Sequence, residues 1–225
     1  MIYCIGDSFT FGAELPDAMD NTTPSNFSWP ALLSQKLNKP VINLGKQGSG
    51  PTRIVKRAMD CVFQDNADII VVAWPSPDRI EWCDKNGIYD VWAGRNAAWM
   101  SEDRHKIIGR ATADWVPEET DRWNYRRWLR TVILLQTFFK SNGQKYIMLQ
   151  TYLSRKYNML YMNNEYESKL IDHIDKDYFL GWPEESMMEW TYGTPTGPWG
   201  HFLEQGHKIV AEKVYEYFRH LGWIS

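Results

Sequence analysis

Residues 68–74, with the sequence DIIVVAW, constrain the fold more than any other segment of the chain. The run is apolar without alternation, is rich in β-branched residues and ends at Pro75, which is typical of a strand buried on both faces of a parallel sheet. Parallel neighbours need crossover connections of about a dozen residues or more, and these are usually helices. The run therefore predicts an α/β fold in which further strands alternate with helices.

Short apolar runs and helical patterns alternate along the rest of the chain. Further strands are expected at residues 1–5, 41–44 and 145–151. Apolar residues recur at helical spacing in residues 29–37, 52–63, 121–140, 165–174 and 207–221, and Ser28 is a possible cap of the first of these helices. This order predicts a three-layer α/β/α sandwich of the flavodoxin-like type, with a mostly parallel sheet of four or five strands.

The length of 225 residues fits a single domain spanning residues 1–225. Two stretches without lasting periodicity, near residues 79–120 and 152–200, are expected to be irregular insertions that cover one edge of the sheet. They hold many of the 12 Trp and 12 Tyr residues. These aromatic side chains could line a sugar-binding groove or pack the insertions onto the core, and packing is the simpler interpretation.

The composition argues against several classes of partner. With 25 basic and 28 acidic residues, the chain has a net charge of -3 and no basic surface signature for nucleic acid or an anionic membrane. No run approaches the roughly 18 apolar residues of a membrane span, and the N-terminus shows no basic leader, so we expect a cytoplasmic protein. Cys4, Cys61 and Cys83 form an odd set without metal-ligand spacing, which favours reduced structural thiols and no metal site.

The segment GDSFT, residues 6–10, follows the first predicted strand directly. Ser8 therefore lies at the carboxyl end of a strand, where open α/β sheets bind their ligands. Asp7 and Ser8 are also residues that cap helices, so Ser8 could be a nucleophile or only part of a βα turn. The three letters G-D-S alone do not separate these alternatives.

Two other segments converge on the same edge of the predicted sheet. The turn GKQGSGP, residues 45–51, follows the second strand and lets the backbone approach a ligand closely. It matches neither common nucleotide-binding glycine pattern, so we expect no cofactor. His201 and His207 precede the last helix and reach this edge if that helix packs back on the sheet.

The order and spacing of these segments resemble the SGNH, or GDSL-like, hydrolase family. The matching residues are GDSFT at 6–10, NLGKQG at 43–48 and HFLEQGH at 201–207. The resemblance implies an esterase in which Ser8 is the nucleophile, His201 the general base, and the N–H groups of Ser8 and Gly48 the oxyanion donors. A serine hydroxyl needs such an imidazole to accept its proton, and the tetrahedral intermediate needs such donors.

Asp7 belongs to the same predicted site. We expect it mainly to tie the turn together through backbone N–H groups. His207 is interpreted as a capping or packing residue rather than a catalytic one.

The third motif of the family, G-x-N-D, is altered in this chain. Pro77 stands where the family has an oxyanion-binding asparagine, and proline has neither an amide side chain nor an N–H group. Ser76 could donate its hydroxyl to the oxyanion, or it could be an ordinary turn serine. Arg79 is a charged alternative, or it forms an ion pair with Asp78 or Glu81.

The last motif is altered as well. The aspartate that the family places three residues before the histidine is Pro198 here. His201 could therefore act in a serine–histidine dyad held by a backbone carbonyl, or a carboxylate from elsewhere, such as that of Glu204 or Glu189, could substitute. Loss of the usual carboxylate predicts a slow or specialised hydrolase.

These observations predict an ester hydrolase acting on a small-molecule or carbohydrate ester, such as an O-acetylated sugar. The alternative is a degenerate protein of the same fold that binds a glycan or a protein without turning it over, as Pro77 and Pro198 suggest. Nucleic acid and membranes are not expected partners. The size and the aromatic insertions also resemble small SGNH-like proteins of phages, which implies a virus-encoded protein.

Overall fold

A parallel five-stranded sheet forms the centre of the protein. The computed structural model describes residues 1–18, 22–84, 87–91, 102–103, 106, 117–152 and 164–224. The strands of this sheet are β1 (Ile2–Ile5), β2 (Val41–Asn43), β3 (Ile69–Trp74), β6 (Lys145–Gln150) and β7 (Phe179–Leu180). Their order is β2-β1-β3-β6-β7 and every neighbouring pair is parallel, which confirms the predicted flavodoxin-like sandwich. The chain order reverses between β1 and β3, and such a switch point is where open α/β sheets bind ligands.

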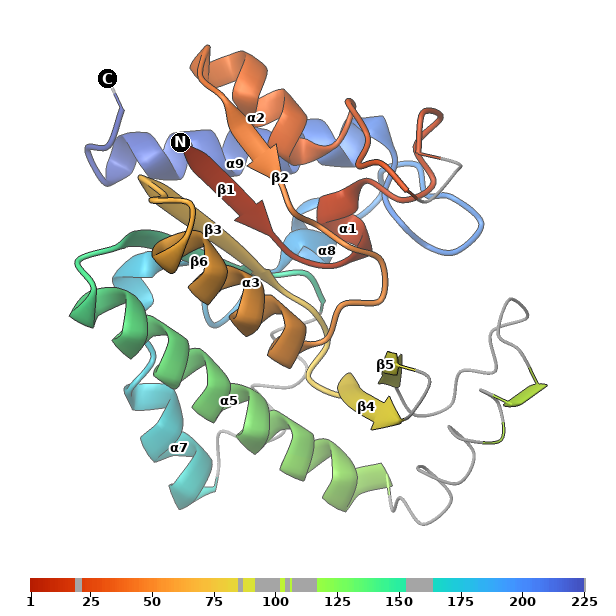
Figure 1. Cartoon of the computed structure of the whole chain (residues 1–225), viewed down its shortest axis with the longest axis vertical. Coiled ribbons are helices and arrows are strands. Elements are labelled where there is room, and N and C mark those ends of the chain that lie inside the picture. The colour runs from red at the N-terminus through yellow and green to blue at the C-terminus, as the bar shows by residue number, and fades with distance from the viewer. Residues whose placement is uncertain are drawn as a thin grey trace.

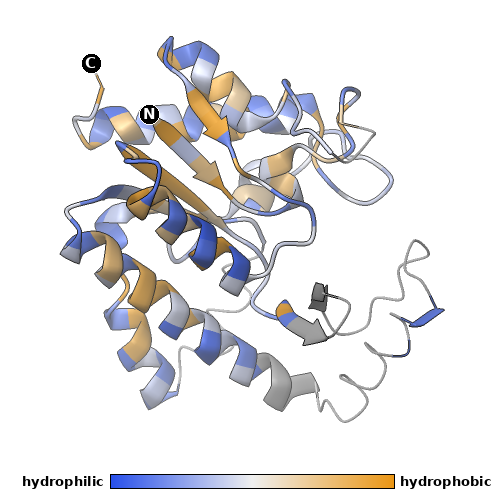
Figure 2. Ribbon diagram, viewed as in Figure 1, coloured by the Kyte–Doolittle hydropathy of each residue, from blue (hydrophilic) through white to orange (hydrophobic). Residues whose placement is uncertain are grey.

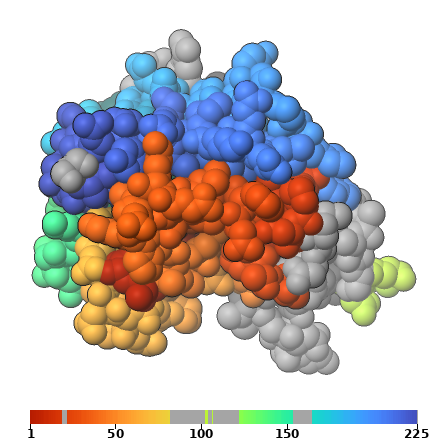
Figure 3. Space-filling model, turned by 90° about the horizontal axis from the view of Figure 1, so that it is seen from above, coloured from red at the N-terminus to blue at the C-terminus, as the bar shows by residue number. Residues whose placement is uncertain are grey.

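Helices cover both faces of the sheet (Figure 1). One face carries α2 (Trp29–Leu37) and α9 (Glu204–His220), which lie side by side in Figure 3. The opposite face carries α3 (Pro51–Phe63) and α5 (Pro117–Ser141), with α7 (Glu165–Asp172) packed outside α5. The shorter helices are α1 (Ser8–Phe11), α8 (Met187–Trp190) and the 3-10 turn Lys176–Tyr178. None of the helices in the described part of the chain combines the length and the apolar character that crossing a bilayer requires.

The sheet is buried on both faces, which explains why its central strand reads as one apolar run. All six residues of β3 are buried. Val72 and its neighbours two positions away pack toward α3 and α5, whereas Val71 and its neighbours pack toward α2 and α9. Figure 2 shows the resulting distribution, with apolar strands at the centre and polar residues on the outward sides of the helices.

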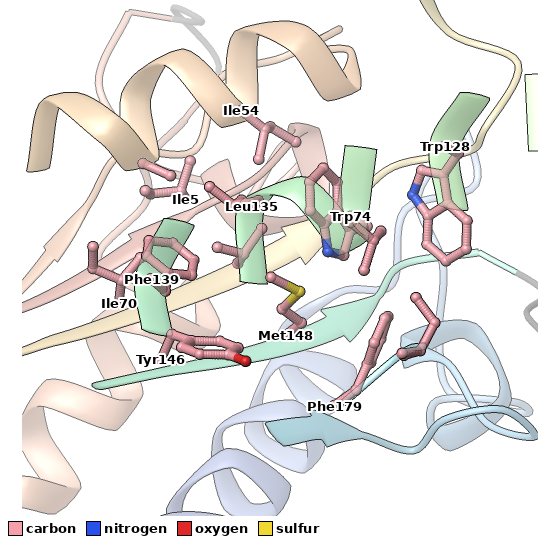
Figure 4. Close-up of a cluster of buried hydrophobic side chains, with 14 of the residues drawn as sticks. Ile5, Ile54, Ile70, Trp74, Trp128, Leu135, Phe139, Tyr146, Met148 and Phe179 are labelled. Atoms are coloured by element: carbon pink, nitrogen blue, oxygen red, sulfur yellow. The ribbon is translucent and has the colours of Figure 1, made fainter. Parts of the chain in front are cut away.

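Several of the aromatic residues pack the core. Figure 4 shows the cluster between β3, β6 and α5, with Trp128 of α5 at one end. The Trp128 ring is fully buried, and its centroid lies 6.3 Å from that of Trp74 and 5.8 Å from those of Tyr125 and Trp182. Of these four residues only Trp182 belongs to an insertion, and it packs against the core cluster as the packing interpretation expects.

The two regions expected to be irregular contain more structure than their sequences indicate. β4 (Ile80–Asp84) and β5 (Gly87–Val91) form an antiparallel pair, so the expectation of an irregular segment beginning at residue 79 was wrong there. Neither segment is strongly apolar. The pairing supplies hydrogen-bond partners for the backbone N–H and C=O groups of both strands. The periodicity of one segment alone does not reveal such pairing. Residues 117–120 of the first insertion already belong to α5. The remainder of that insertion, apart from residues 102–103 and 106, and residues 153–163 of the second lie outside the described residues.

Two of the three cysteines are free and buried, Cys4 in β1 and Cys61 in α3. Burial raises the pKa of both thiols, that of Cys61 to about 12, so neither is a thiolate at neutral pH. These two cysteines are structural, as predicted. The side chain of Cys83 lies outside the described residues.

We predict that Trp128→Ala lowers the free energy of unfolding by roughly 3–5 kcal/mol, because it removes a large ring from a fully packed aromatic cluster. Leu134→Ala on the same helix is the matched control. Its side chain is 70% exposed, and its effect should stay within about 0.5 kcal/mol. Urea unfolding followed by tryptophan fluorescence measures both values, and equal losses for the two variants would contradict this assignment of the core.

Candidate active site

Ser8 is the first residue of α1, directly beyond the carboxyl end of β1. The preceding Asp7 caps this short helix, since its Oδ1 accepts the N–H of Phe9 at 3.1 Å. Only 6% of Ser8 is exposed. Its own N–H belongs to the first turn, where a helix has no internal acceptor for that group. The serine hydroxyl and an N–H without an acceptor inside the helix therefore lie together at the switch point of the sheet.

The second motif, residues 43–48, is bonded to the first at two points. Lys46 N–H donates to the Gly6 carbonyl at 3.0 Å. The Asn43 side chain donates to the Thr10 carbonyl at 2.8 Å. These bonds fix the second motif against the first.

A close contact explains one glycine of the turn at residues 45–51, and the backbone conformation explains another. A Cβ on Gly45 would lie 2.4 Å from the Phe11 nitrogen, so a larger residue would push the two turns apart. Gly48 has a φ of +74°, in the left-handed region that glycine adopts without strain. The Ser49 N–H donates to the Lys46 carbonyl at 3.1 Å and closes the turn around Gly48.

His201 lies against the serine, although 193 positions separate them in the sequence. Its Nε2 is 2.9 Å from Ser8 Oγ. The ring packs on Phe9, with centroids 4.6 Å apart, and 15% of the side chain is exposed. The structure thus brings together the serine and the histidine that the sequence singled out.

Glu14 holds the other side of the imidazole. Its Oε2 lies 2.6 Å from His201 Nδ1 and also accepts the His201 backbone N–H at 3.2 Å. Its Oε1 accepts the Trp199 N–H at 2.8 Å. An ionised carboxylate only accepts hydrogen bonds, so the ring proton is assigned to Nδ1 and Nε2 is left to accept from the Ser8 hydroxyl.

A carboxylate from elsewhere in the chain does orient His201, but the two acids named as examples were wrong. The carboxylate of Glu189 accepts from the Ser186 hydroxyl, and Glu204 is exposed in the first turn of α9. Neither holds His201, and the partner of Nδ1 is a carboxylate rather than a backbone carbonyl. The sequence does place the loop after α1 on the side of Ser8, but it does not show which of the acidic residues there turns inward.

The conformation of Glu14 is unusual and has a steric counterpart. Its φ is +67°, in the left-handed region that non-glycine residues seldom adopt. A Cβ on Gly197 would lie 2.6 Å from the Glu14 carboxyl carbon. The absence of a side chain at Gly197 is therefore what gives the carboxylate its place beside His201.

The altered third motif forms a turn after β3. Ser76 is half-buried there, and its carbonyl accepts the Arg79 N–H at 3.3 Å. The Pro77 carbonyl accepts from Arg127 of α5 at 3.2 Å. The Arg79 side chain pairs with the buried Asp7 at 2.9 Å, so the expectation that it pairs with Asp78 or Glu81 was wrong. This partner could not be predicted from local spacing, because Asp7 lies in the first motif, 72 positions before Arg79.

Comparison with known proteins was informative only at the level of structure, since no protein-family model and no curated protein matches the sequence. A protein of the G-D-S-L family from Desulfitobacterium hafniense aligns over 96% of this chain and 98% of its own, with a TM-score of 0.54 at 14% identity. The esterase EstA from Pseudoalteromonas aligns over 98% and 97%, with a TM-score of 0.55 at 7% identity. The chain has the SGNH hydrolase fold.

Another SGNH-fold neighbour is a family two carbohydrate esterase from Clostridium thermocellum, solved with cellohexaose. It covers 99% of this chain and 65% of its own, with a TM-score of 0.56 at 14% identity. Among the described residues of this SGNH fold, no group of three or more His, Cys, Asp and Glu side chains could hold a metal ion.

His207 supports the site from within the core. It is fully buried, and its Nδ1 accepts the N–H of Trp29, the first residue of α2, at 3.0 Å. Ser28 occupies the N-cap position of α2, as expected, but its side chain makes no capping bond because its hydroxyl donates to the Ser25 carbonyl instead. Burial, and secondarily the charge of nearby His201, lowers the pKa of His207 from 6.5 to about 3. His207 is therefore a neutral packing and capping residue.

We predict that His207 makes the protein less stable as the pH falls from about 6.5 to about 3. In that interval the unfolded chain binds a proton on this residue and the folded chain does not, so stability rises with pH. The contribution is about 1.4 kcal/mol per pH unit for one proton. His207→Gln should have a correspondingly flatter dependence in urea unfolding at a series of pH values. Parallel curves for the two proteins would contradict the assignment.

Proposed function

We propose that this protein is a serine ester hydrolase with a catalytic triad of Ser8, His201 and Glu14. The observation that carries the proposal is the continuous hydrogen-bonded chain from Ser8 Oγ to His201 Nε2, at 2.9 Å, and from His201 Nδ1 to Glu14, at 2.6 Å. Nucleophile, base and orienting acid stand in the order and at the distances that acyl transfer requires. In this proposal Glu14 takes over the role of the carboxylate that is lost at Pro198.

The reaction follows from these contacts. Ser8 Oγ attacks the ester carbonyl while His201 Nε2 takes the hydroxyl proton, and Glu14 stabilises the resulting imidazolium. The tetrahedral intermediate collapses to an acyl-serine as His201 returns the proton to the departing alcohol. Water, deprotonated by His201, then attacks the acyl-serine, and its proton returns to Ser8 as the carboxylic acid leaves.

The N–H groups of Ser8 and Gly48 are proposed as the oxyanion donors. Ser8 provides an N–H from the first turn of α1, and Gly48 lies in the turn that is bonded to it. Loss of one such donor typically costs about a hundredfold to a thousandfold in kcat. Because Pro77 has no N–H to offer, the Ser76 hydroxyl is the proposed third donor.

The proposed substrate is an ester of a small molecule or a carbohydrate. Two aromatic rings on the segment that leads to His201 are exposed, Tyr192 at 93% and Trp199 at 63%. Exposed rings of this kind can receive the apolar face of a sugar. The Clostridium thermocellum neighbour, a carbohydrate esterase, acts on that class of compound and supports the choice.

A fluorophosphonate probe tests the proposed nucleophile. We expect stoichiometric labelling of the native protein, complete loss in Ser8→Ala, and unchanged labelling in Ser141→Ala, whose hydroxyl lies at the end of α5. Hydrolysis of p-nitrophenyl acetate and of an acetylated xylo-oligosaccharide should be lost in the same variant. Absence of both labelling and hydrolysis in pure native protein would overturn the proposal in favour of a glycan- or protein-binding module.

Glu14→Gln should lower kcat by a hundredfold to ten-thousandfold, because an amide can donate to Nδ1 and so favours the wrong imidazole tautomer; the upper limit is the effect in the serine-protease template. Gly197→Ala should also impair the enzyme, since its new methyl group meets the Glu14 carboxylate. Glu189→Gln and Glu204→Gln are the matched controls and should keep kcat within about twofold. Steady-state kinetics would contradict the role of Glu14 if all four variants behaved alike.

A further inference from the structure

We propose that Arg79 is a positioning residue that holds the two oxyanion donors in register. The inference rests on the proposed function and deepens it, because it says how a chain with Pro77 in its third motif keeps its oxyanion site assembled. Arg79 lies two residues beyond that proline and comes from the same turn.

A single nitrogen of Arg79 joins the two turns that carry the donors. Nη1 lies 2.9 Å from Asp7 Oδ2 and 3.3 Å from the Ser49 carbonyl oxygen. Asp7 immediately precedes Ser8, and Ser49 immediately follows Gly48. The guanidinium is therefore bonded to the residue next to each proposed donor.

Burial makes this contact rigid and resistant to salt. Asp7 is fully buried, and the Arg79 side chain is 10% exposed. Ion pairs removed from water in this way are screened far less than surface pairs. The second carboxylate oxygen of Asp7 accepts the Phe9 N–H. Asp7 therefore connects Arg79 to the first turn of α1, where the Ser8 N–H lies.

The guanidinium also faces the side of the site that carries the histidine. Its central carbon lies 5.8 Å from the centroid of the Tyr152 ring, which follows β6. Tyr152 packs edge-on against Phe9 at 5.2 Å, and Phe9 packs against the His201 ring at 4.6 Å. Arg79 thus contacts residues that follow β1, β2 and β6.

Arg79 is itself held in place by a residue of α5, on the face of the sheet that carries α3 and α5. Arg127 of α5 donates to the Pro77 carbonyl at 3.2 Å and to the Arg79 carbonyl at 2.9 Å. The turn is thus held by its carbonyl groups. A proline at position 77 cannot donate a hydrogen bond, but its fixed φ and its bonded carbonyl keep the following arginine in place.

Arg79→Met and Arg79→Lys form the principal test. With p-nitrophenyl acetate, Arg79→Met should lower kcat by about a hundredfold and leave KM within about threefold, because misplacement of positioned groups by about 1 Å has an effect of this size. Arg79→Lys keeps a cation that can donate to both oxygens. Its kcat should be at least tenfold higher than that of Arg79→Met. Equal kcat values for Arg79→Met and the native enzyme would overturn the inference.

A matched control separates positioning from the general loss of a buried ion pair. Arg126 pairs with the fully buried Glu167 at 2.6 Å, between α5 and α7. Arg126→Met leaves that carboxylate unpaired and should lower stability without changing kcat. If Arg79→Met does not fold, Asp7→Asn combined with Arg79→Met removes both charges. This double variant should fold and still show the loss in kcat, and native kcat in it would contradict the inference.

Hydrogen–deuterium exchange gives a readout that does not depend on turnover. Arg79→Met, or the double variant if the single one does not fold, should exchange faster than the native protein in residues 6–12 and 45–50 and at the native rate in α9. Unchanged exchange in those two segments would overturn the inference even in an active enzyme. A native protein that neither reacts with the probe nor hydrolyses esters would instead refute the proposed function. The positioning role of Arg79 would then be judged by hydrogen–deuterium exchange alone.

Discussion

The carboxylate of Glu14 is the contact on which the arrangement around Ser8 depends. It accepts hydrogen bonds from the His201 ring, the His201 backbone and the Trp199 backbone, and so fixes both the ring and the segment that carries it. Without this carboxylate, the Nδ1 side of the ring would lose its partner, and the packing of the ring on Phe9 and the contact of Nε2 with Ser8 would remain. The left-handed backbone of Glu14 is the conformation in which one short loop reaches all three donors.

The fold could be predicted from the sequence because its determinants are local or periodic. The apolar run of β3, the short strands β1, β2 and β6, and the main helices all appear as patterns within single segments. The two-residue strand β7 and the hairpin of β4 and β5 could not be predicted in this way, since they exist through pairing with other segments. The low identity to proteins of the same fold agrees with this, because a buried parallel sheet needs apolar β-formers rather than particular residues.

The site could be predicted only in part, and the missing contacts share a physical reason. Ser8, Gly48 and His201 stand in recognisable motifs, and the carboxyl ends of parallel strands meet at one edge. The partners of charged groups are set by how loops fold over that edge. Glu14 beside His201, Asp7 beside Arg79 and His207 at the start of α2 each join residues far apart in the chain. No periodicity or local spacing encodes such pairs.

The position of Glu14 also affects which parts of such a chain can change in sequence while the proposed triad is kept. The proposed acid and nucleophile belong to one continuous segment, residues 7–14, and the only long-range member of the triad is the histidine. The segment before His201 contributes no charged group to the triad; it provides a backbone N–H at position 199, which any residue except proline supplies, and space at Gly197. Gly193 and Gly200 of that segment are constrained by their positive φ, and its other side chains take no part in the proposed triad. Proteins with this arrangement can therefore acquire new specificities in a loop whose side chains carry no part of the proton transfer.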